Sequence, residues 1–89
     1  MIEGVKVCEI SDGKIFVAIQ PPLRKVELER IQTEILGYIK EIDKFALAGK
    51  IGQRKGISHF RITTPYPWPE LKKAVEIGLK KGLKELNRA

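Results

Sequence analysis

The spacing of hydrophobic residues changes from period two to a helical period along this 89-residue chain, and the change limits the folds open to it. Residues 5–10 and 15–19 are rich in Val, Ile and Phe, and Asp12-Gly13 between them suits a tight turn. The chain is therefore expected to open with a β-hairpin. The second strand is apolar on both sides, which predicts a central place in a sheet, with Ile15, Val17 and Ile19 on one face and Phe16 and Ala18 on the other.

A long amphipathic helix is predicted after the prolines that end this strand. Apolar residues recur every three or four positions over 28–46, and charged residues occupy the remaining sides. With Gly49 as its C-cap, the helix would have roughly 20 to 26 residues and a length of about 30 to 40 Å. The alternative is a break near Asp43, after which residues 45–48 form a short strand.

Residues 49–56 combine three glycines with three cations, which are Lys50, Arg54 and Lys55. Glycines allow turns that direct successive backbone N–H groups toward one anion, and flanking cations add charge. We therefore expect this segment either to be a loop that can bind phosphate or to be a solvated hairpin or helix-to-strand turn. The alternation of apolar and polar residues that follows predicts a strand over 57–63.

The clearest amphipathic helix is predicted from Pro69 to about Asn87. Gly78 and Gly82 lie in its apolar stripe, where glycine costs about 1 kcal/mol relative to alanine, so a close approach to another backbone is expected there. The element order ββα(β)βα predicts a single α+β domain over residues 1–89. Its architecture would be a two-layer sandwich, with two helices packed on one face of a small antiparallel sheet.

Positive charge is concentrated in the second half of the chain. Residues 1–48 carry seven Lys or Arg against eight Asp or Glu, a net charge of −1, whereas residues 49–89 carry ten against three, a net charge of +7. Such a surface raises the local concentration of polyanions. On a helical projection, five cations of the last helix lie within about 100° of one another, opposite the apolar stripe: Lys73, Lys80, Lys81, Lys84 and Arg88.

Residues 63–69 alternate proline with aromatic residues, which holds Tyr66 and Trp68 in an extended connection. Exposed beside cations, either ring can stack on an unpaired base. Packed inward, Trp68 would instead act as a hydrophobic staple at the start of the last helix. The sequence leaves both alternatives open.

Catalysis finds little support among the polar residues. His59 is the only histidine, and its neighbour Ser58 would point to the opposite face of a strand, so the two do not form a base and nucleophile. One histidine and the single Cys8 are too few for a structural zinc site without carboxylates. We therefore expect no catalytic residue, no metal and no cofactor, and Cys8 is expected to be a core residue.

Features of targeting are also lacking in the sequence. No apolar run is long enough to span a membrane, and no signal-peptide pattern is recognised, so no membrane association is expected. A lone cysteine suits a reducing compartment, which makes the cytoplasm the expected location. The low Asn content beside many Lys, Glu and Ile favours a thermophilic source.

The sequence therefore predicts a small non-catalytic nucleic-acid-binding protein, with RNA favoured over DNA. The alternative is a protein-interaction subunit or homodimer, in which the hairpin edge, Ile77 and residues 66–68 form the contact. The sequence leaves open whether the basic segment 49–56 and the basic helix face share one surface. The predicted nucleic-acid contacts are Lys50, Arg54, Lys55, Arg61, Tyr66, Trp68, Lys73, Lys80, Lys81 and Lys84.

Overall fold

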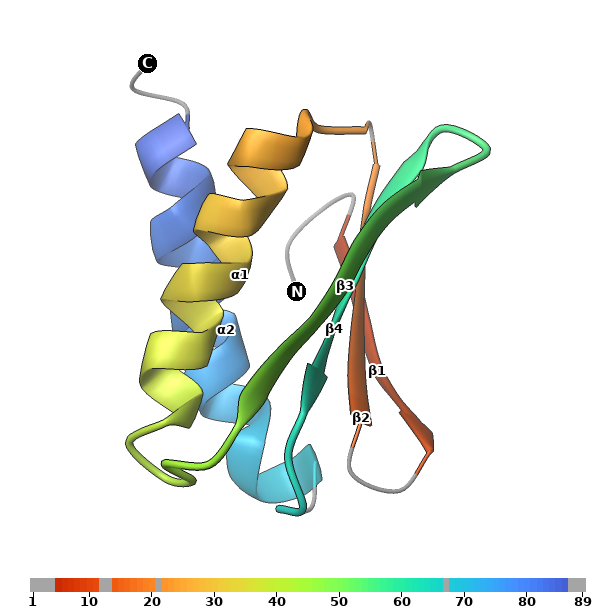
Figure 1. Cartoon of the computed structure of the whole chain (residues 1–89). Helices are drawn as coiled ribbons and strands as arrows, with labels where there is room; N and C mark the ends of the chain where they lie inside the picture. The colour runs from red at the N-terminus through yellow and green to blue at the C-terminus, as the bar shows by residue number, and fades with distance from the viewer. Residues whose placement is uncertain (1–4, 12–13, 21, 67, 87–89) are drawn as a thin grey trace.

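Four strands form one antiparallel sheet, and both helices cover the same face of it (Figure 1). The computed structural model describes residues 5–11, 14–20, 22–66 and 68–86, with the backbone alone at 5–11, 68 and 86. The predicted Asp12-Gly13 turn and the side chain of Cys8 lie outside this description. The elements are β1 (Val5–Ser11), β2 (Lys14–Ile19), α1 (Lys25–Ile39), β3 (Leu47–Arg54), β4 (Ile57–Thr63) and α2 (Trp68–Leu86).

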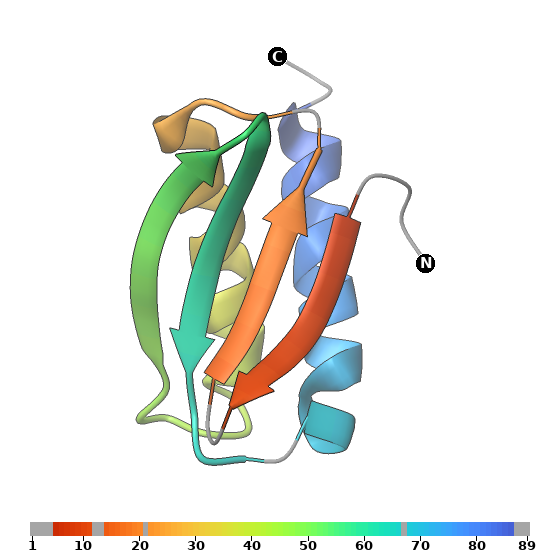
Figure 2. The ribbon, with the colours of Figure 1, turned by 90° about the vertical axis from the view of Figure 1, so that its right-hand side faces the viewer.

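The strand order is β1-β2-β4-β3, so β2 and β4 are the central strands. Figure 2 shows the sheet in front with both helices behind it. The predicted two-layer α+β fold and the central place of β2 are confirmed. Within the described residues, neither helix is apolar enough over its length to cross a membrane.

The core lies between the sheet and the helices. On β2, Ile15, Val17 and Ile19 are buried, as the alternation of the sequence predicts. On β4 the buried positions are Ser58, Phe60 and Ile62, which face the same layer. The helices contribute the rest of the apolar interior, chiefly Leu28, Ile31, Ile35, Ile39, Leu71, Val75 and Leu79.

The two helices approach each other closely at the glycines of α2. A Cβ atom built on Gly78 would lie 2.6 Å from the Cα of Ile35, and one on Gly82 would lie 3.1 Å from the Cγ1 of Ile31. Both distances are shorter than ordinary packing contacts, so any larger residue would push the helices apart. The predicted close approach of the glycines to another backbone is confirmed.

The first helix is shorter than the longer sequence prediction. It has 15 residues and ends at Ile39, so a helix of 20 to 26 residues with Gly49 as C-cap is wrong. The chain turns instead at the buried Asp43, whose carboxylate accepts hydrogen bonds from the Phe45 N–H (3.0 Å) and the Thr64 hydroxyl (2.7 Å). The alternative break near Asp43 is closer to the structure, although the strand that follows is longer than 45–48.

The prediction of a loop over residues 49–56 is also wrong, because most of it is β3, and the turn of the hairpin is at Lys55 and Gly56. The strand glycines are required by close neighbours on β4. A Cβ on Gly49 would lie 2.9 Å from the Cβ of Arg61, and one on Gly52 would lie 2.7 Å from the Cε1 of His59. Each glycine in this strand therefore marks a close contact across the sheet. The same glycines give the strand a composition that resembles that of a loop.

The β3–β4 pairing contains one irregularity. Ala48 pairs with Ile62 and Ile51 with Phe60, so Gly49 and Lys50 both lie opposite Arg61, which is the pattern of a β-bulge. The side-chain amide of Gln32 stabilises this point, since its Nε2 donates hydrogen bonds to the carbonyl oxygens of Gly49 and Arg61, both at 3.0 Å. Helix α1 is thereby fixed against the bulge.

The fold consists of two similar ββα halves. Corresponding ends of the elements in the two halves are 43 residues apart in sequence. This spacing separates the end of β1 from that of β3 (Ser11 and Arg54), the start of β2 from that of β4 (Lys14 and Ile57), and the start of α1 from that of α2 (Lys25 and Trp68). Strands β2 and β4 pair antiparallel, and the two helices run in opposite directions (Figure 1). An approximate twofold axis therefore passes between β2 and β4 and relates the halves.

Candidate nucleic-acid interface

Figure 2 shows the face of the sheet that lies away from the helices, here called the open face. The side chains of the central strands that do not point toward the helices lie on this face. Because side chains alternate along a strand, burial of Ile15 and Val17 places Phe16 on the open face, and burial of Phe60 and Ile62 places His59 and Arg61 there. Both Phe16 and His59 are half-buried. The described helices do not cover them.

Phe16 and His59 form an aromatic pair on the open face. Their ring centroids are 5.5 Å apart and their planes are inclined by 29°. The register pairs Phe16 with Arg61 and Ala18 with His59, so the two rings are diagonal neighbours across β2 and β4. Phe16 and His59 are also 43 residues apart, so they occupy equivalent positions in the two halves and the aromatic pair lies beside the twofold axis.

Cations surround this pair, mainly from β3 and β4. Arg61 is exposed beside Phe16, and Arg54, also exposed, pairs with Ile57 at the far end of the hairpin. Alternation places Arg54 and Lys14 on the open face as well, because they pair with Ile57 and Thr63, which share the face of His59. Aromatic rings and exposed cations therefore occur together on the open face, the combination that binds unpaired bases and their phosphates.

The four basic residues predicted from the segment around 49–61 are brought together by the β3–β4 hairpin. Lys50 occupies the bulge opposite Arg61, and Arg54 ends β3. Lys55 is in the turn with a left-handed φ of 52°, and its side chain is exposed. The four cations are exposed on β3, on β4 and on the turn between these strands. The hairpin therefore brings them to the surface without a separate loop.

The basic face of α2 lies on the other side of the molecule. Lys73, Lys80 and Lys84 are exposed, whereas Leu71, Val75 and Leu79 of the same helix are buried toward the interior. Because the helix layer separates these lysines from the open face, the two basic groups predicted from sequence do not share one surface. Arg88 lies outside the described residues.

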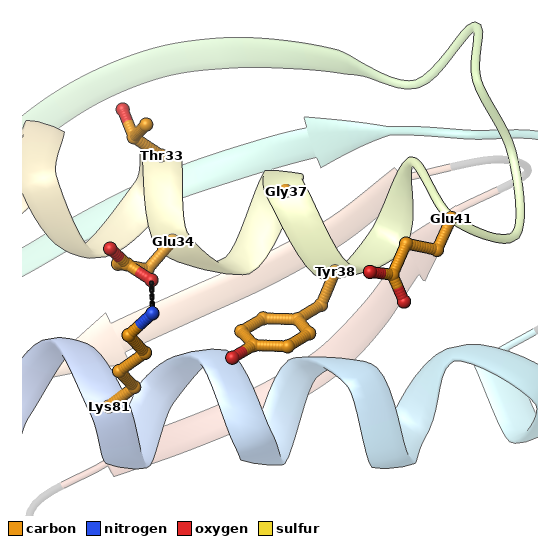
Figure 3. Close-up of a pocket in the computed structure, with 6 residues that line it drawn as sticks. All are labelled: Thr33, Glu34, Gly37, Tyr38, Glu41 and Lys81. Atoms are coloured by element: carbon orange, nitrogen blue, oxygen red, sulfur yellow. Dashed lines mark ion pairs between the residues drawn. The ribbon is translucent and has the colours of Figure 1, made fainter.

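Lys81 differs from the other lysines of α2 because it contacts α1. Its Nζ lies 3.6 Å from Oε2 of Glu34, and this carboxylate raises the pKa of Lys81 above its ordinary value, with a smaller contribution from Tyr38 (Figure 3). An open depression of about 360 Å³ runs along this helix seam, where Figure 3 shows the Tyr38 ring lying between the helices. The charge of Lys81 is thus partly neutralised within the protein.

Of the two predicted aromatic contacts, Tyr66 does not join the open-face pair. Tyr66 is 37% exposed and lines a different depression together with Ile42 and Phe45. Its backbone N–H donates to the hydroxyl of Thr64 at 3.3 Å. The side chain of Trp68 lies outside the described residues, so the choice between a staple and a stacking residue stays open.

Sequence reasoning missed the two aromatic residues of the candidate site. It placed Phe16 and His59 correctly on alternating faces, but treated each strand alone. The signal that could have found them is an aromatic residue at the middle of each of two strands that are both apolar on their inward face. Only the pairing of β2 with β4 brings the rings together.

Comparison with known proteins adds no family assignment: protein-family models, curated proteins and solved structures all gave no match. Among the described residues, no cluster of three or more His, Cys, Asp or Glu side chains is placed to hold a metal ion. The two depressions named above are lined by helix and turn residues and do not include His59. The candidate site therefore rests on the chemistry of the open face.

Proposed function

We propose that this protein binds single-stranded nucleic acid, RNA in preference to DNA, on the open face of its sheet, and that it does so without catalysing a reaction. The observation that supports the proposal most directly is the Phe16–His59 pair on the two central strands, beside the exposed Arg61. One known class of RNA-binding domain uses a four-stranded sheet whose aromatic residues stack two or three bases.

The chemistry of the open face favours a single strand over a duplex. A base can stack on an aromatic ring only when its own face is free, and a duplex keeps those faces covered. The exposed cations Lys14, Arg54 and Arg61 would contact phosphates, which gives affinity but no sequence preference. We therefore expect shape and strand recognition, with affinity that falls as salt concentration rises.

The decisive variant is Phe16→Leu, which keeps apolar bulk on the sheet and removes the aromatic face. Fluorescence anisotropy of labelled single-stranded RNA should show binding about tenfold weaker than wild type, because one base stack contributes roughly 1 to 3 kcal/mol. Single-stranded DNA and duplex RNA probes of the same length rank the classes of ligand, with single-stranded RNA expected to bind most tightly. Thermal unfolding should confirm that the variant is folded.

A matched pair of charge variants distinguishes the open face from the α2 face. Arg54→Ala/Arg61→Ala and Lys80→Ala/Lys84→Ala each remove two exposed cations, so they change net charge equally. Arg54→Ala/Arg61→Ala should lower the affinity for single-stranded RNA and make the affinity depend less on salt concentration. Lys80→Ala/Lys84→Ala should leave both the affinity and its salt dependence nearly unchanged. Equal losses would show that binding depends on net charge and not on the open face, and a loss confined to the α2 variant would move the site to the helix. Absence of binding by the wild-type protein at low salt would refute the proposal.

A second candidate function is self-association, which an exposed apolar cluster favours. Phe45 and Leu47 are 76% and 64% exposed, and Phe45 lines the same depression as Ile42 and Tyr66. The cluster adjoins β3, an edge strand of the described sheet, and such an edge is where two copies of a chain can pair. Ile77, the contact predicted from sequence, is 41% exposed on α2.

This candidate predicts a dimer formed by two copies of the chain through the apolar cluster. Sedimentation velocity at high salt should then show a dimer for the wild-type protein, and Phe45→Ser/Leu47→Ser should shift it to a monomer because both substitutions remove exposed apolar surface from the contact. Ile77→Ser is the control for an exposed apolar residue elsewhere. A wild-type monomer over the full range of protein concentration would exclude self-association.

A further inference from the structure

The two ββα halves have diverged in charge although their strands and helices follow the same order. Residues 5–19 of the first hairpin carry Lys6 and Lys14 against Glu9 and Asp12, a net charge of 0. The equivalent residues 48–62 of the second hairpin carry four Lys or Arg and no Asp or Glu, a net charge of +4 with His59 neutral. At positions related by the offset of 43 residues, the second hairpin replaces Ser11 by Arg54, Asp12 by Lys55 and Ala18 by Arg61. Lys50 is an additional cation in the bulge of β3, whereas the register irregularity of β1 lies between Glu9 and Ser11.

The aromatic pair does not share this asymmetry. Phe16 and His59 are themselves equivalent, and each comes from a central strand, so the stacking surface is centred on the twofold axis. The cations are instead concentrated on the side of β3 and β4, where Lys50, Arg54 and Arg61 lie, with Lys14 of β2 as the exception among the described residues. Bases and phosphates of a bound strand would thus meet chemically different parts of the open face, one central and one lateral.

Building on the proposed function, we infer that a bound single-stranded RNA has one fixed path: its bases contact Phe16 and His59, and its phosphates follow the β3–β4 hairpin. Lys50 at the bulge and Arg61 opposite it lie near one end of this path, and Arg54 lies near the other. These two positions on β3 are separated by four residues, about 13 Å along a strand. The β1–β2 side carries only two cations, Lys6 and Lys14, and their charge is balanced by Glu9 and Asp12.

The path can be tested by moving one cation across the axis. Arg61→Ala removes a cation from the proposed phosphate track, and Ala18→Arg adds one at the equivalent position of the other half. For single-stranded RNA, Arg61→Ala should lower the slope of log affinity against log salt by about 0.7, the value for one phosphate contact on a single strand. Ala18→Arg alone should leave the slope unchanged, and the double variant should keep the lowered slope.

Restoration of the wild-type slope in the double variant would overturn the fixed path, because it would show that a cation works equally well on either side. A second swap, Arg54→Ala with Ser11→Arg, tests the other end of the hairpins and protects the result against misfolding of either Ala18 variant. Phe16→Leu separates the two proposals. If it weakens binding while both swaps restore the slope, the proposed function stands and the path is wrong; if the wild-type protein does not bind, both fail.

Discussion

Replacing Asp43 with alanine is expected to lower the free energy of unfolding by about 3 kcal/mol. The Asp43 carboxylate is buried and accepts two hydrogen bonds, from the Phe45 N–H and from the Thr64 hydroxyl. Hydrogen bonds to charged groups contribute roughly 1.5 to 3 kcal/mol each, and the substitution leaves the buried Thr64 hydroxyl without this acceptor. The carboxylate joins the turn after α1 to the connection after β4, so its loss should loosen both segments together. Urea unfolding followed by circular dichroism measures the change.

The matched control is Glu41→Ala, which removes an exposed carboxylate two residues away and should change stability by less than about 0.5 kcal/mol. A double-mutant cycle of Asp43→Ala with Thr64→Ala then isolates their 2.7 Å hydrogen bond, and a coupling free energy of about 1 kcal/mol or more is expected. If Asp43→Ala is as mild as Glu41→Ala, this contact does not hold the turn.

The elements best predicted from sequence are those whose signal is local. The second strand alternates between Ile15, Val17 and Ile19 and their neighbours, and this alternation alone defines its inward face. The last helix likewise has its start signalled by proline and its buried stripe by apolar spacing. Even the purpose of Gly78 could be inferred, because a glycine inside an apolar helical stripe needs a compensating contact.

The end of α1 and the extent of β3 were mispredicted because both depend on residues distant in sequence. Asp43 ends the helical region through Thr64, which is 21 residues further along the chain. The glycines of β3 are explained by His59 and Arg61 on the neighbouring strand. The pattern of residues within 49–56 does not include His59 or Arg61, and the pattern of the first helix does not include Thr64. The glycines and cations of 49–56 were therefore interpreted as a loop.

The repeat of the ββα unit was also invisible to sequence reasoning. Between residues 5–43 and 48–86 the identical pairs are few, and burial explains the shared apolar character of positions such as Leu28 and Leu71. The identical pairs are Gly13/Gly56, Ile19/Ile62, Pro22/Pro65, Glu27/Glu70, Leu28/Leu71 and Leu36/Leu79. The aromatic pair is hidden for the same reason, since Phe16 and His59 are equivalent in position and different in kind.

The two-layer arrangement decides how the excess positive charge can act. The cations of β3 and β4 and the lysines of α2 lie on opposite layers, so a single short strand of nucleic acid contacts one set or the other. The rings of Phe16 and His59 lie beside the first set, and Lys81 of the second set forms an ion pair with Glu34. Stacking and charge therefore coincide on the open face, which is why the proposed site is placed there.

Gly78→Ala is expected to destabilise the protein by about 1 to 3 kcal/mol, although alanine is the better helix former. The new Cβ would lie 2.6 Å from the Cα of Ile35, and backbone cannot rotate aside as the end of a side chain can, so the two helices must separate. Separation would weaken the packing of Ile35 and of the neighbouring contact between Gly82 and Ile31. Urea unfolding of the variant measures the loss.

Gly37→Ala is the matched control, because Gly37 is also a helix glycine but has no heavy atom within 4 Å of the position its Cβ would take. It should stabilise the protein by up to about 1 kcal/mol, the difference in helix propensity between the two residues. The same substitution thus has opposite signs at two sites, and the difference between them measures the cost of separating α1 from α2. A stabilising effect at both glycines would show that the helices move apart freely and that their close approach at Gly78 is not needed for stability.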